Sequence, residues 1–143
     1  MDILLTHGYF LNDDPHELRI MKPYPPLGIL YISAYLKQRG YNSGVFDSTF
    51  RSISEFESAL QRERPPVVGI YGTLMTKSGV LKMIRSAKAA GALVVLGGPE
   101  PANYVEEYLA SGADVVVFGE GEEALADLLP QLARNGLDGL ETV

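Results

Sequence analysis

The sequence predicts an α/β protein in which helices cover both faces of a parallel β-sheet. Five short apolar runs rich in β-branched residues recur along the 143 residues. Near-continuous apolar strands of this kind are typical of parallel sheets that are buried on both faces. Segments with helical periodicity separate the runs, and right-handed crossovers then give a three-layer sandwich.

The predicted strands each end at a residue that favours a loop or turn. They cover residues 3–6, 43–46, 67–71, 93–96 and 115–118. Glycine follows the third, fourth and fifth of these runs, and Asp47 follows the second. The strand ends are therefore well marked.

The predicted helices fill the intervals between strands and cover residues 27–39, 54–64, 76–90, 102–111 and 121–133. In the second, Ser54 and Glu57 have the spacing of a capping box. In the last, Pro130 predicts a kink or an early stop. The first is expected to bury one apolar stripe, made of Leu27, Leu30, Tyr31, Ala34, Tyr35 and Leu36.

Five strands in this order favour a flavodoxin-like (Rossmann-type) sheet with the strand order 2-1-3-4-5. Such sheets bind ligands at the carboxyl ends of the strands, where the direction of winding changes. We expect one α/β domain over residues 1–134, with residues 135–143 as a tail or linker toward an absent downstream domain.

One connection, over residues 8–26, is unusually long for a strand-to-helix loop, which commonly has about 2–6 residues. It lies at the carboxyl edge of the predicted sheet. A lid or docking surface is the favoured interpretation, and a disordered insertion is the alternative.

The composition excludes several classes of function. The net charge is −6 and no basic stripe is visible, which argues against nucleic acid as a partner. No apolar stretch reaches the roughly 20 residues of a membrane span, and the N-terminus lacks the features of a signal peptide, so a cytoplasmic location is expected. With no cysteine and two histidines, the chain cannot ligate an iron–sulfur cluster through thiolates, and no multi-histidine metal site is predicted.

Two glycine-rich loops indicate where a ligand binds. Gly97-Gly98-Pro99-Glu100-Pro101 follows the fourth strand and Gly119-Glu120-Gly121-Glu122 follows the fifth. Glycine lets a ligand approach the main chain closely. The two loops therefore predict a site for a bulky cofactor at one edge of the sheet.

Three ordered motifs carry a family resemblance. They are the segment 25–36, which begins Pro25-Pro26-Leu27-Gly28, then Val94-Val95-Leu96-Gly97-Gly98-Pro99, and then the segment 114–122. Together they resemble the cobalamin (vitamin B12)-binding domain that precedes the radical S-adenosylmethionine domain in cobalamin-dependent radical enzymes. The resemblance implies that the corrin ring lies over the strand ends and that the nucleotide tail enters the flank of the sheet.

The resemblance also implies a set of cofactor contacts, in which Gly72-Thr73-Leu74 and Gly97-Gly98 line the tail pocket and the hydroxyls of Thr73 and Thr76 bind polar groups of the tail. On this basis Gly98→Leu is expected to abolish binding and to leave the fold intact. The full set of predicted contacts is Tyr9, Pro26, Leu27, Gly28, Gly72, Thr73, Leu74, Thr76, Gly97, Gly98, Pro99, Glu100, Gly119, Glu120 and Gly121.

Some candidates have two interpretations. Asp14-Pro15-His16 carries part of the D-x-H-x-x-G motif that supplies a histidine to cobalt, but Arg19 replaces its glycine, and an exposed loop histidine is favoured for His16. His7 is expected to be a polar strand-end residue, and Glu100 stands where the family often has histidine.

For the remaining candidates, Glu120 and Glu122 are expected to complement the N-terminus of a helix, with a catalytic acid–base pair as the alternative. Tyr31 and Tyr35 are assigned to the core or a domain interface, and Tyr9 and Phe10 are candidates to cover the corrin.

Two functions remain open from the sequence. The first is a cobalamin-binding module of a radical S-adenosylmethionine enzyme, most simply a methyltransferase. This chain would then supply no catalytic residue, and S-adenosylmethionine and the [4Fe–4S] cluster would bind an absent downstream domain. The second is a degenerate flavodoxin-like interaction or substrate-docking domain that binds no cofactor.

Overall fold

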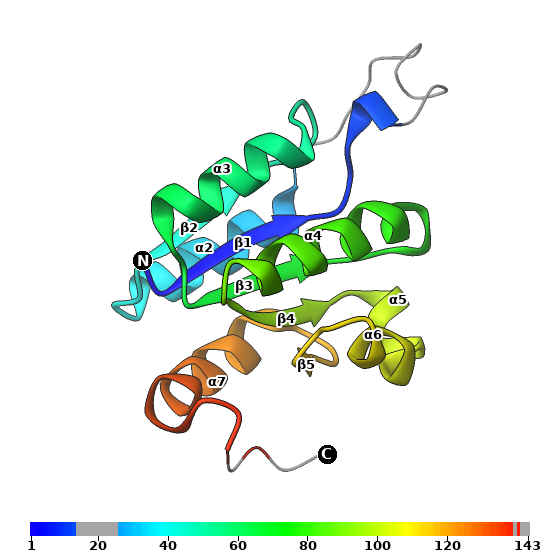
Figure 1. Ribbon diagram of the computed structural model, residues 1–143. Coiled ribbons are helices and arrows are strands. Elements are labelled where there is room, and N and C mark those ends of the chain that lie inside the picture. The colour runs from blue at the N-terminus through cyan, green and yellow to red at the C-terminus, as the bar shows by residue number, and fades with distance from the viewer. Residues whose placement is uncertain (14–25, 139, 141–143) are drawn as a thin grey trace.

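The computed structural model describes residues 1–13, 26–138 and 140. Its centre is a five-stranded, all-parallel sheet with the order β2-β1-β3-β4-β5, which confirms the predicted fold (Figure 1). The strands are β1 (Ile3–His7), β2 (Ser43–Phe46), β3 (Val67–Tyr71), β4 (Leu93–Gly97) and β5 (Val115–Val116).

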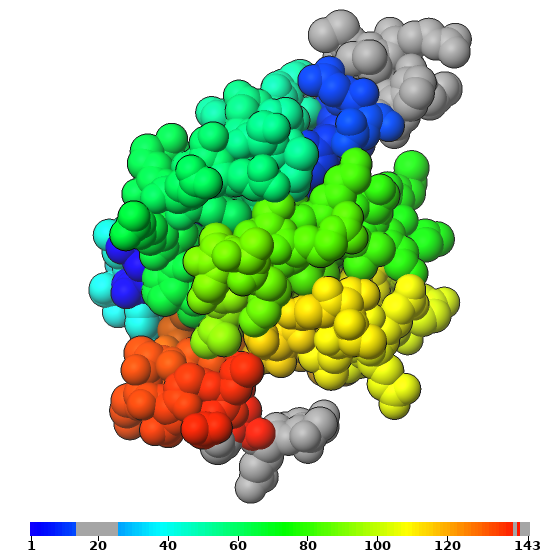
Figure 2. All heavy atoms as spheres, viewed as in Figure 1, coloured from blue at the N-terminus to red at the C-terminus, as the bar shows by residue number. Residues whose placement is uncertain are grey.

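Helices cover both faces of the sheet. The first face carries α3 (Ile53–Glu63), α4 (Lys77–Ala89) and α6 (Val105–Ala110), and the second carries α2 (Leu27–Gln38) and α7 (Gly121–Asn135). The short elements are η1 (Leu11–Asp13), η2 (Leu74–Thr76) and α5 (Pro99–Asn103). Figure 2 shows α3, α4 and the α5–α6 segment as one continuous surface over the first face.

The strands are buried on both faces, as the continuous apolar runs predict. In β1, Leu4 packs into the core beneath α3 and α4, whereas Ile3 and Leu5 pack into the core beneath α2 and α7. All five residues of β1 are buried. Because alternate side chains point to opposite faces, one apolar strand contributes to two separate cores.

The start of α3 corrects the predicted cap. Ser52, not Ser54, is the N-cap, because its hydroxyl accepts a hydrogen bond from Glu55 N at 3.2 Å and Glu55 Oε2 accepts one from Ser52 N at 2.7 Å. The sequence contains two overlapping S-x-x-E patterns, so local spacing cannot separate them. Starting at Ser52 places Ile53 in the first turn, where it packs against the core.

The C-terminal half departs from prediction in three places. β5 ends at Val116, two residues early, although Val117 N still donates to Leu96 O at 2.8 Å. The next helix begins at Pro99 instead of residue 102, since proline suits a first helical turn, and it is broken at Tyr104. α7 does not stop at Pro130 but runs on to Asn135.

The predicted apolar stripe of α2 is wrong for four of its six residues, whereas Leu36 is buried and Tyr35 packs against the core as predicted. Ile29, Ser33 and Leu36 face the core, while Leu27, Leu30, Tyr31 and Ala34 are exposed. Eight of the ten residues from Leu27 to Leu36 are apolar or aromatic, so periodicity does not define one face. The buried Ser33 hydroxyl is satisfied by Ser43 Oγ at 2.7 Å, which fixes the helix against β2.

The described part of the long connection after β1 is packed against the domain. Phe10 and Leu11 are buried, and Leu11 N donates to Thr49 O at 2.9 Å. Phe10 therefore belongs to the core and does not cover a ligand, contrary to prediction. The remaining residues, 14–25, which include His16, lie outside the described part of the structure. None of the described helices is long and apolar enough to cross a bilayer.

Candidate cofactor site at the carboxyl edge

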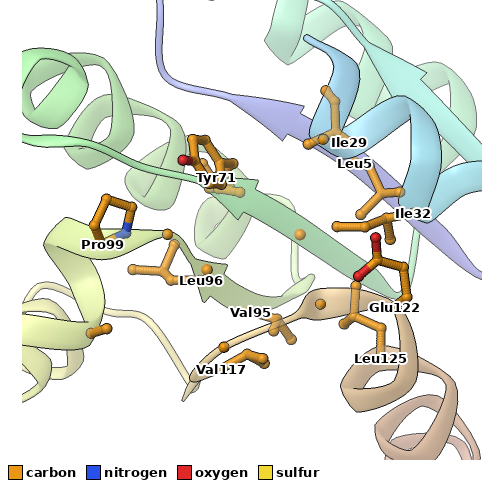
Figure 3. Close-up of a pocket in the computed structure, with 18 residues that line it drawn as sticks. Leu5, Ile29, Ile32, Tyr71, Val95, Leu96, Pro99, Val117, Glu122 and Leu125 are labelled. Carbon is orange, nitrogen blue, oxygen red and sulfur yellow. The ribbon is translucent and has the colours of Figure 1, made fainter.

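Two adjoining cavities open at the carboxyl edge of the sheet. The inner cavity, of about 440 Å³, lies between the sheet and the pair α2 and α7 (Figure 3). The outer cavity, of about 330 Å³, lies between the end of β1, the start of α2 and the segment after β3. Gly28, Ile29 and Tyr71 line both cavities, so the two lie next to each other.

The floor of the inner cavity follows from the strand register. Leu5, Gly69 and Val95 are direct neighbours across β1, β3 and β4. The next row on the same face, two residues nearer the carboxyl edge, is His7, Tyr71 and Gly97. We call the first the deep row and the second the mouth row. The cavity thus runs down the strands from the edge of the sheet.

The lining of the inner cavity is apolar except at its mouth. Two of its side chains are polar: Tyr71 is the last residue of β3, and Glu122 lies in the first turn of α7. The Glu122 carboxylate makes no hydrogen bond or ion pair with any described residue. The lining consists of Leu5, Gly28, Ile29, Ile32, Gly69, Ile70, Tyr71, Val95, Leu96, Gly97, Gly98, Pro99, Ala102, Val117, Gly119, Gly121, Glu122 and Leu125.

The glycines at the mouth have different structural roles. A Cβ added at Gly28 or Gly97 would meet no atom within 4 Å, so the absent side chains leave open space in the cavity. Gly119 also has open space beside it, but its φ of +75° favours glycine for backbone reasons as well. Gly98 is different, because its φ is +104° and a Cβ there would collide with the Gly72 carbonyl oxygen. Gly98 is required by the backbone itself.

A partly buried hydrogen-bond network surrounds His7, which lines the outer cavity. The Tyr9 amide donates to His7 Nδ1 at 3.2 Å, so the neutral ring carries its proton on Nε2 and donates it to Asp47 Oδ1 at 2.7 Å. Ser48 Oγ lies 2.7 Å from the His7 carbonyl oxygen and 2.6 Å from the Tyr9 carbonyl oxygen, and its one proton is donated to either of them. Both ring nitrogens are engaged, so His7 serves as the predicted polar strand-end residue and presents no free nitrogen to a metal.

Asp47 is the charged member of this network. Partial burial raises the pKa of its carboxyl, but hydrogen bonds from Thr49 and His7 outweigh the burial, so the pKa lies below the ordinary value of 3.8. Thr49 donates to Asp47 Oδ1 through both its hydroxyl, at 2.6 Å, and its amide, at 3.1 Å. The carboxylate thereby orients the His7 ring.

Eleven predicted contacts line the cavities, and the structure brings them together from distant parts of the chain. The inner cavity has Gly28, Gly97, Gly98, Pro99, Gly119 and Gly121, and the outer cavity has Tyr9, Pro26, Leu27, Gly28, Thr73 and Thr76.

Four predicted contacts lie outside both linings. Gly72 faces Val80 and Pro101, and Leu74 is exposed. Glu120 is the exposed N-cap residue of α7, and Glu100 is buried with its carboxylate 3.8 Å from Lys77 Nζ. Thr73 and Thr76 are in the outer rather than the inner cavity, and their hydroxyls already form the capping box of η2.

Glu100 belongs to a polar cluster on the other face of the sheet. Lys77 Nζ donates to Glu107 Oε1 at 2.6 Å and lies 5.7 Å from the centre of the Tyr108 ring. Burial raises the pKa of Tyr108, and the nearby Glu100 charge raises it further. This cluster joins α4 to α5 and α6 and so fixes the loop that carries Gly97 and Gly98.

The sequence prediction missed the residues that shape the inner cavity most. Gly69 has the clearest signal, since a glycine inside an apolar strand marks a close approach of another group. Ile29, Ile32 and Leu125 were hidden because they are ordinary apolar residues on helical stripes. Tyr71, which lines both cavities, is the last residue of a strand and belongs to none of the three family motifs.

Exposed apolar side chains surround the opening. Leu74, Met75 and Phe118 are 71%, 87% and 58% exposed, and each follows the end of a strand. Leu27 and Tyr71 are exposed in the same region. Exposed apolar groups gathered beside a cavity are typical of a surface that binds a ligand or partner.

An apolar cavity that opens beside glycine-rich loops at the carboxyl edge of a doubly wound sheet defines a cofactor-binding α/β domain. The family model described as "B12 binding domain" matches residues 19–129, and the chain belongs to this family.

One sequence relative and one solved structure with a similar fold were also found. The chain is 30% identical over 116 residues to an uncharacterized methyltransferase of Synechocystis sp.; the match covers 81% of this chain and 21% of that protein. The fold is similar to that of a de novo designed Rossmann 2x3 protein solved by NMR, with a TM-score of 0.59 and 12% identity over 99% of this chain and 95% of the design.

Proposed function

We propose that this domain binds cobalamin with the nucleotide tail in the inner cavity and the corrin ring over the outer cavity. The observation that carries the proposal is the position of Gly28 and Gly97. Each lines the inner cavity at a point where any larger side chain would fill open space. A long, narrow group needs such an unobstructed path along the main chain.

The outer cavity suits the broader part of the ligand. Pro26, Leu27 and Tyr71 supply apolar surface there, and the exposed Leu74 and Met75 extend it. When bound, cobalamin supplies a cobalt centre that can carry a methyl group, while the protein supplies binding and orientation. Within residues 1–13, 26–138 and 140, no cluster of three histidine or acidic side chains is arranged to hold a metal ion.

The wider proposal concerns a larger protein. The chain spans 21% of the length of the Synechocystis relative, whose name describes a methyltransferase. We propose that this domain presents cobalamin to a radical S-adenosylmethionine domain that performs methyl transfer. The absence of cysteine from the sequence requires that another polypeptide segment hold the [4Fe–4S] cluster. A Cys-x-x-x-Cys-x-x-Cys pattern in that segment is the corresponding expectation.

Mixing the purified chain with hydroxocobalamin tests the first proposal. The expected result is a changed visible spectrum and cobalamin that stays with the protein on a desalting column. Gly97→Leu is expected to lower the affinity by about tenfold or more, because the added side chain enters the inner cavity. Ala89→Leu adds a side chain to the exposed end of α4, on the other face, and is expected to bind as the wild type does.

The alternative, an interaction domain without a cofactor, predicts another result. The wild-type chain would then leave cobalamin unretained and its spectrum unchanged. Equal binding by Gly97→Leu and Ala89→Leu would show that cobalamin binds elsewhere on the chain.

A further inference from the structure

Lys77 and Glu100 each come directly after a residue that lines one of the cavities. Thr76 lines the outer cavity and is followed by Lys77, the first residue of α4. Pro99 lines the inner cavity and is followed by Glu100, in the first turn of α5. The starts of α4 and α5 both lie at the carboxyl edge of the sheet (Figure 1). Lys77 Nζ lies 3.8 Å from Glu100 Oε1, so an ion pair joins the loop after β3 to the loop after β4.

The backbones of the same two loops also meet. Gly72 N donates a hydrogen bond to Gly97 O at 2.9 Å. Gly98 packs against the carbonyl group of Gly72. The loops therefore share one contact at the ends of the strands and a second, the ion pair, at the starts of the helices. A change at the ion pair is transmitted along the loop to Gly97 and Pro99, which line the inner cavity.

The Glu100 carboxylate needs a counter-charge because the residue is almost fully buried, with 7% of its surface exposed. Within the described part of the chain, Lys77 is the cation that pairs with it. A buried carboxylate that loses its partner is destabilising, since neither water nor an opposite charge then stabilises it. Removing the Lys77 ammonium would therefore favour any movement of the loop that returns Glu100 to water.

Lys77 is held in place independently of Glu100. Its Nζ donates to Glu107 Oε1 at 2.6 Å, and this hydrogen bond raises the pKa of Lys77. The ammonium also lies 5.9 Å and 5.7 Å from the ring centres of Tyr104 and Tyr108, within the range of cation–π contacts. The two residues therefore depend on each other unequally. Lys77 keeps other partners if Glu100 loses its charge, whereas Glu100 loses its counter-charge if Lys77 is replaced.

We propose that Lys77 is a positioning residue of the cobalamin site, whose ammonium neutralises Glu100 and so holds the loop after β4 against the loop after β3 in the arrangement that binds the ligand. The inference rests on the proposed function and assigns part of it to two residues outside both cavity linings. Without Lys77, the loop that carries Gly97 and Pro99 opens in a fraction of the molecules. The apparent affinity for cobalamin then falls in proportion to the fraction that stays closed.

Titration with hydroxocobalamin, followed by its visible spectrum, measures the affinity of each variant. Lys77→Met keeps most of the apolar length of the side chain and removes its charge, so it is expected to bind about tenfold more weakly than the wild type. The matched control is Lys88→Met, on the same helix. Lys88 Nζ lies 2.9 Å from Asp114 Oδ2, another largely buried carboxylate, but neither residue lines a cavity. This control should bind as the wild type does.

A double variant and a measurement without ligand separate positioning from general stability. Lys77→Met combined with Glu100→Gln removes the buried charge together with its partner, and it is expected to recover the wild-type affinity to within about threefold. Hydrogen exchange followed by NMR reports on the loops in the absence of cobalamin. The Gly72 amide, which donates to Gly97 O, is expected to exchange at least about threefold faster in Lys77→Met. In Lys88→Met and in the double variant it should exchange at the wild-type rate.

Equal affinities of Lys77→Met and Lys88→Met would overturn the inference and leave the proposed function standing. A loss of affinity that the double variant does not restore would also overturn it, because the charge of Glu100 would then not be the cause. If Lys77→Met alone does not fold, a folded double variant that binds as the wild type does supports the inference, and any other result contradicts it.

Failure of the wild-type chain to bind cobalamin would instead overturn the proposed function. The exchange of the Gly72 amide then tests the position of the loops by itself. Faster exchange in Lys77→Met than in Lys88→Met would support the role of Lys77 in holding the loops together, and equal rates would exclude it.

Discussion

At the scale of single residues, the structure requires glycine at two adjacent positions of one loop for different reasons. Gly97 lines the inner cavity with free space where a side chain would be. Gly98 adopts a φ of +104° and packs against the backbone of Gly72. The expectation that Gly98→Leu would remove binding and spare the fold is therefore unsuitable as a test, because such a variant disturbs the backbone first. Gly97 is the position that probes the cavity alone.

Alanine substitutions separate these two roles. Gly98→Ala is expected to lower the free energy of unfolding by about 2 kcal/mol or more, because alanine is strained at this φ and its Cβ meets Gly72. Gly97→Ala is the matched control and should change it by about 0.5 kcal/mol at most. Urea unfolding followed by circular dichroism measures both values. Equal stabilities of the two variants would contradict the assignment.

The Asp47 carboxylate gives a prediction about pH. Its pKa in the folded chain lies below 3.8, so its stabilising effect is present above that pH and is lost as the pH falls through the folded value. Asp47→Ala is expected to lower the free energy of unfolding at pH 7 by about 1 kcal/mol, a modest amount because the side chain is half exposed.

Urea unfolding at a series of pH values tests this prediction. The difference between wild type and Asp47→Ala should shrink below about pH 4. A difference that stays constant down to pH 3 would mean that the charge of Asp47 does not stabilise the fold.

At the scale of elements, the sequence predicted which segments form strands and helices better than it predicted their limits. Val67–Tyr71 agrees with prediction because a buried strand has a dense apolar signal bounded by proline and glycine. The position of α2 in the chain was predicted correctly, but most of the side that faces the sheet was not. Eight of its first ten residues are apolar or aromatic, so their spacing does not show which side is buried. Packing against β2, through Ser33 and Ser43, decides it.

The two overlapping caps of α3 can be separated by mutation. Ser52→Ala is expected to lower the free energy of unfolding by about 1 kcal/mol, because the Glu55 amide loses its acceptor. Ser54→Ala is the control: it removes the same hydroxyl group two residues later, at an exposed position of the helix, and should have little effect on stability. Thermal or urea unfolding of both variants makes the comparison. A larger loss from Ser54→Ala would favour the cap predicted from the sequence.

The candidate site was predictable where its residues have unusual backbone requirements. The loops after β4 and β5 could be recognised because clusters of glycine are uncommon and indicate a turn or a close approach to the main chain. Leu5, Ile32, Val95 and Leu125 could not be found in this way, since a leucine or valine that lines a cavity resembles one that fills a core. The register of three strands and the position of two helices together define their role.

At the scale of the whole molecule, the two faces of the sheet differ in how completely they are filled. Beneath α3, α4 and α6, the core is continuous and includes the large side chains of Phe56, Met83 and Tyr108. Beneath α2 and α7, the core is closed toward the amino ends of the strands and hollow toward their carboxyl ends. A cavity in a core lowers the free energy of unfolding, because packing contacts are missing. A ligand that fills the cavity beneath α2 and α7 can restore part of this stability.

Ligand binding should therefore stabilise the whole domain. A ligand that binds the folded state alone adds RT ln(1 + [L]/Kd), or about 2.7 kcal/mol at a hundredfold excess over Kd. Cobalamin is expected to raise the free energy of unfolding of the wild-type chain by that amount in urea titrations. Gly97→Leu should unfold like the wild type without cobalamin and gain little with it, because its side chain already occupies the mouth of the inner cavity. If both chains gained equally, the stabilising ligand would bind outside that cavity.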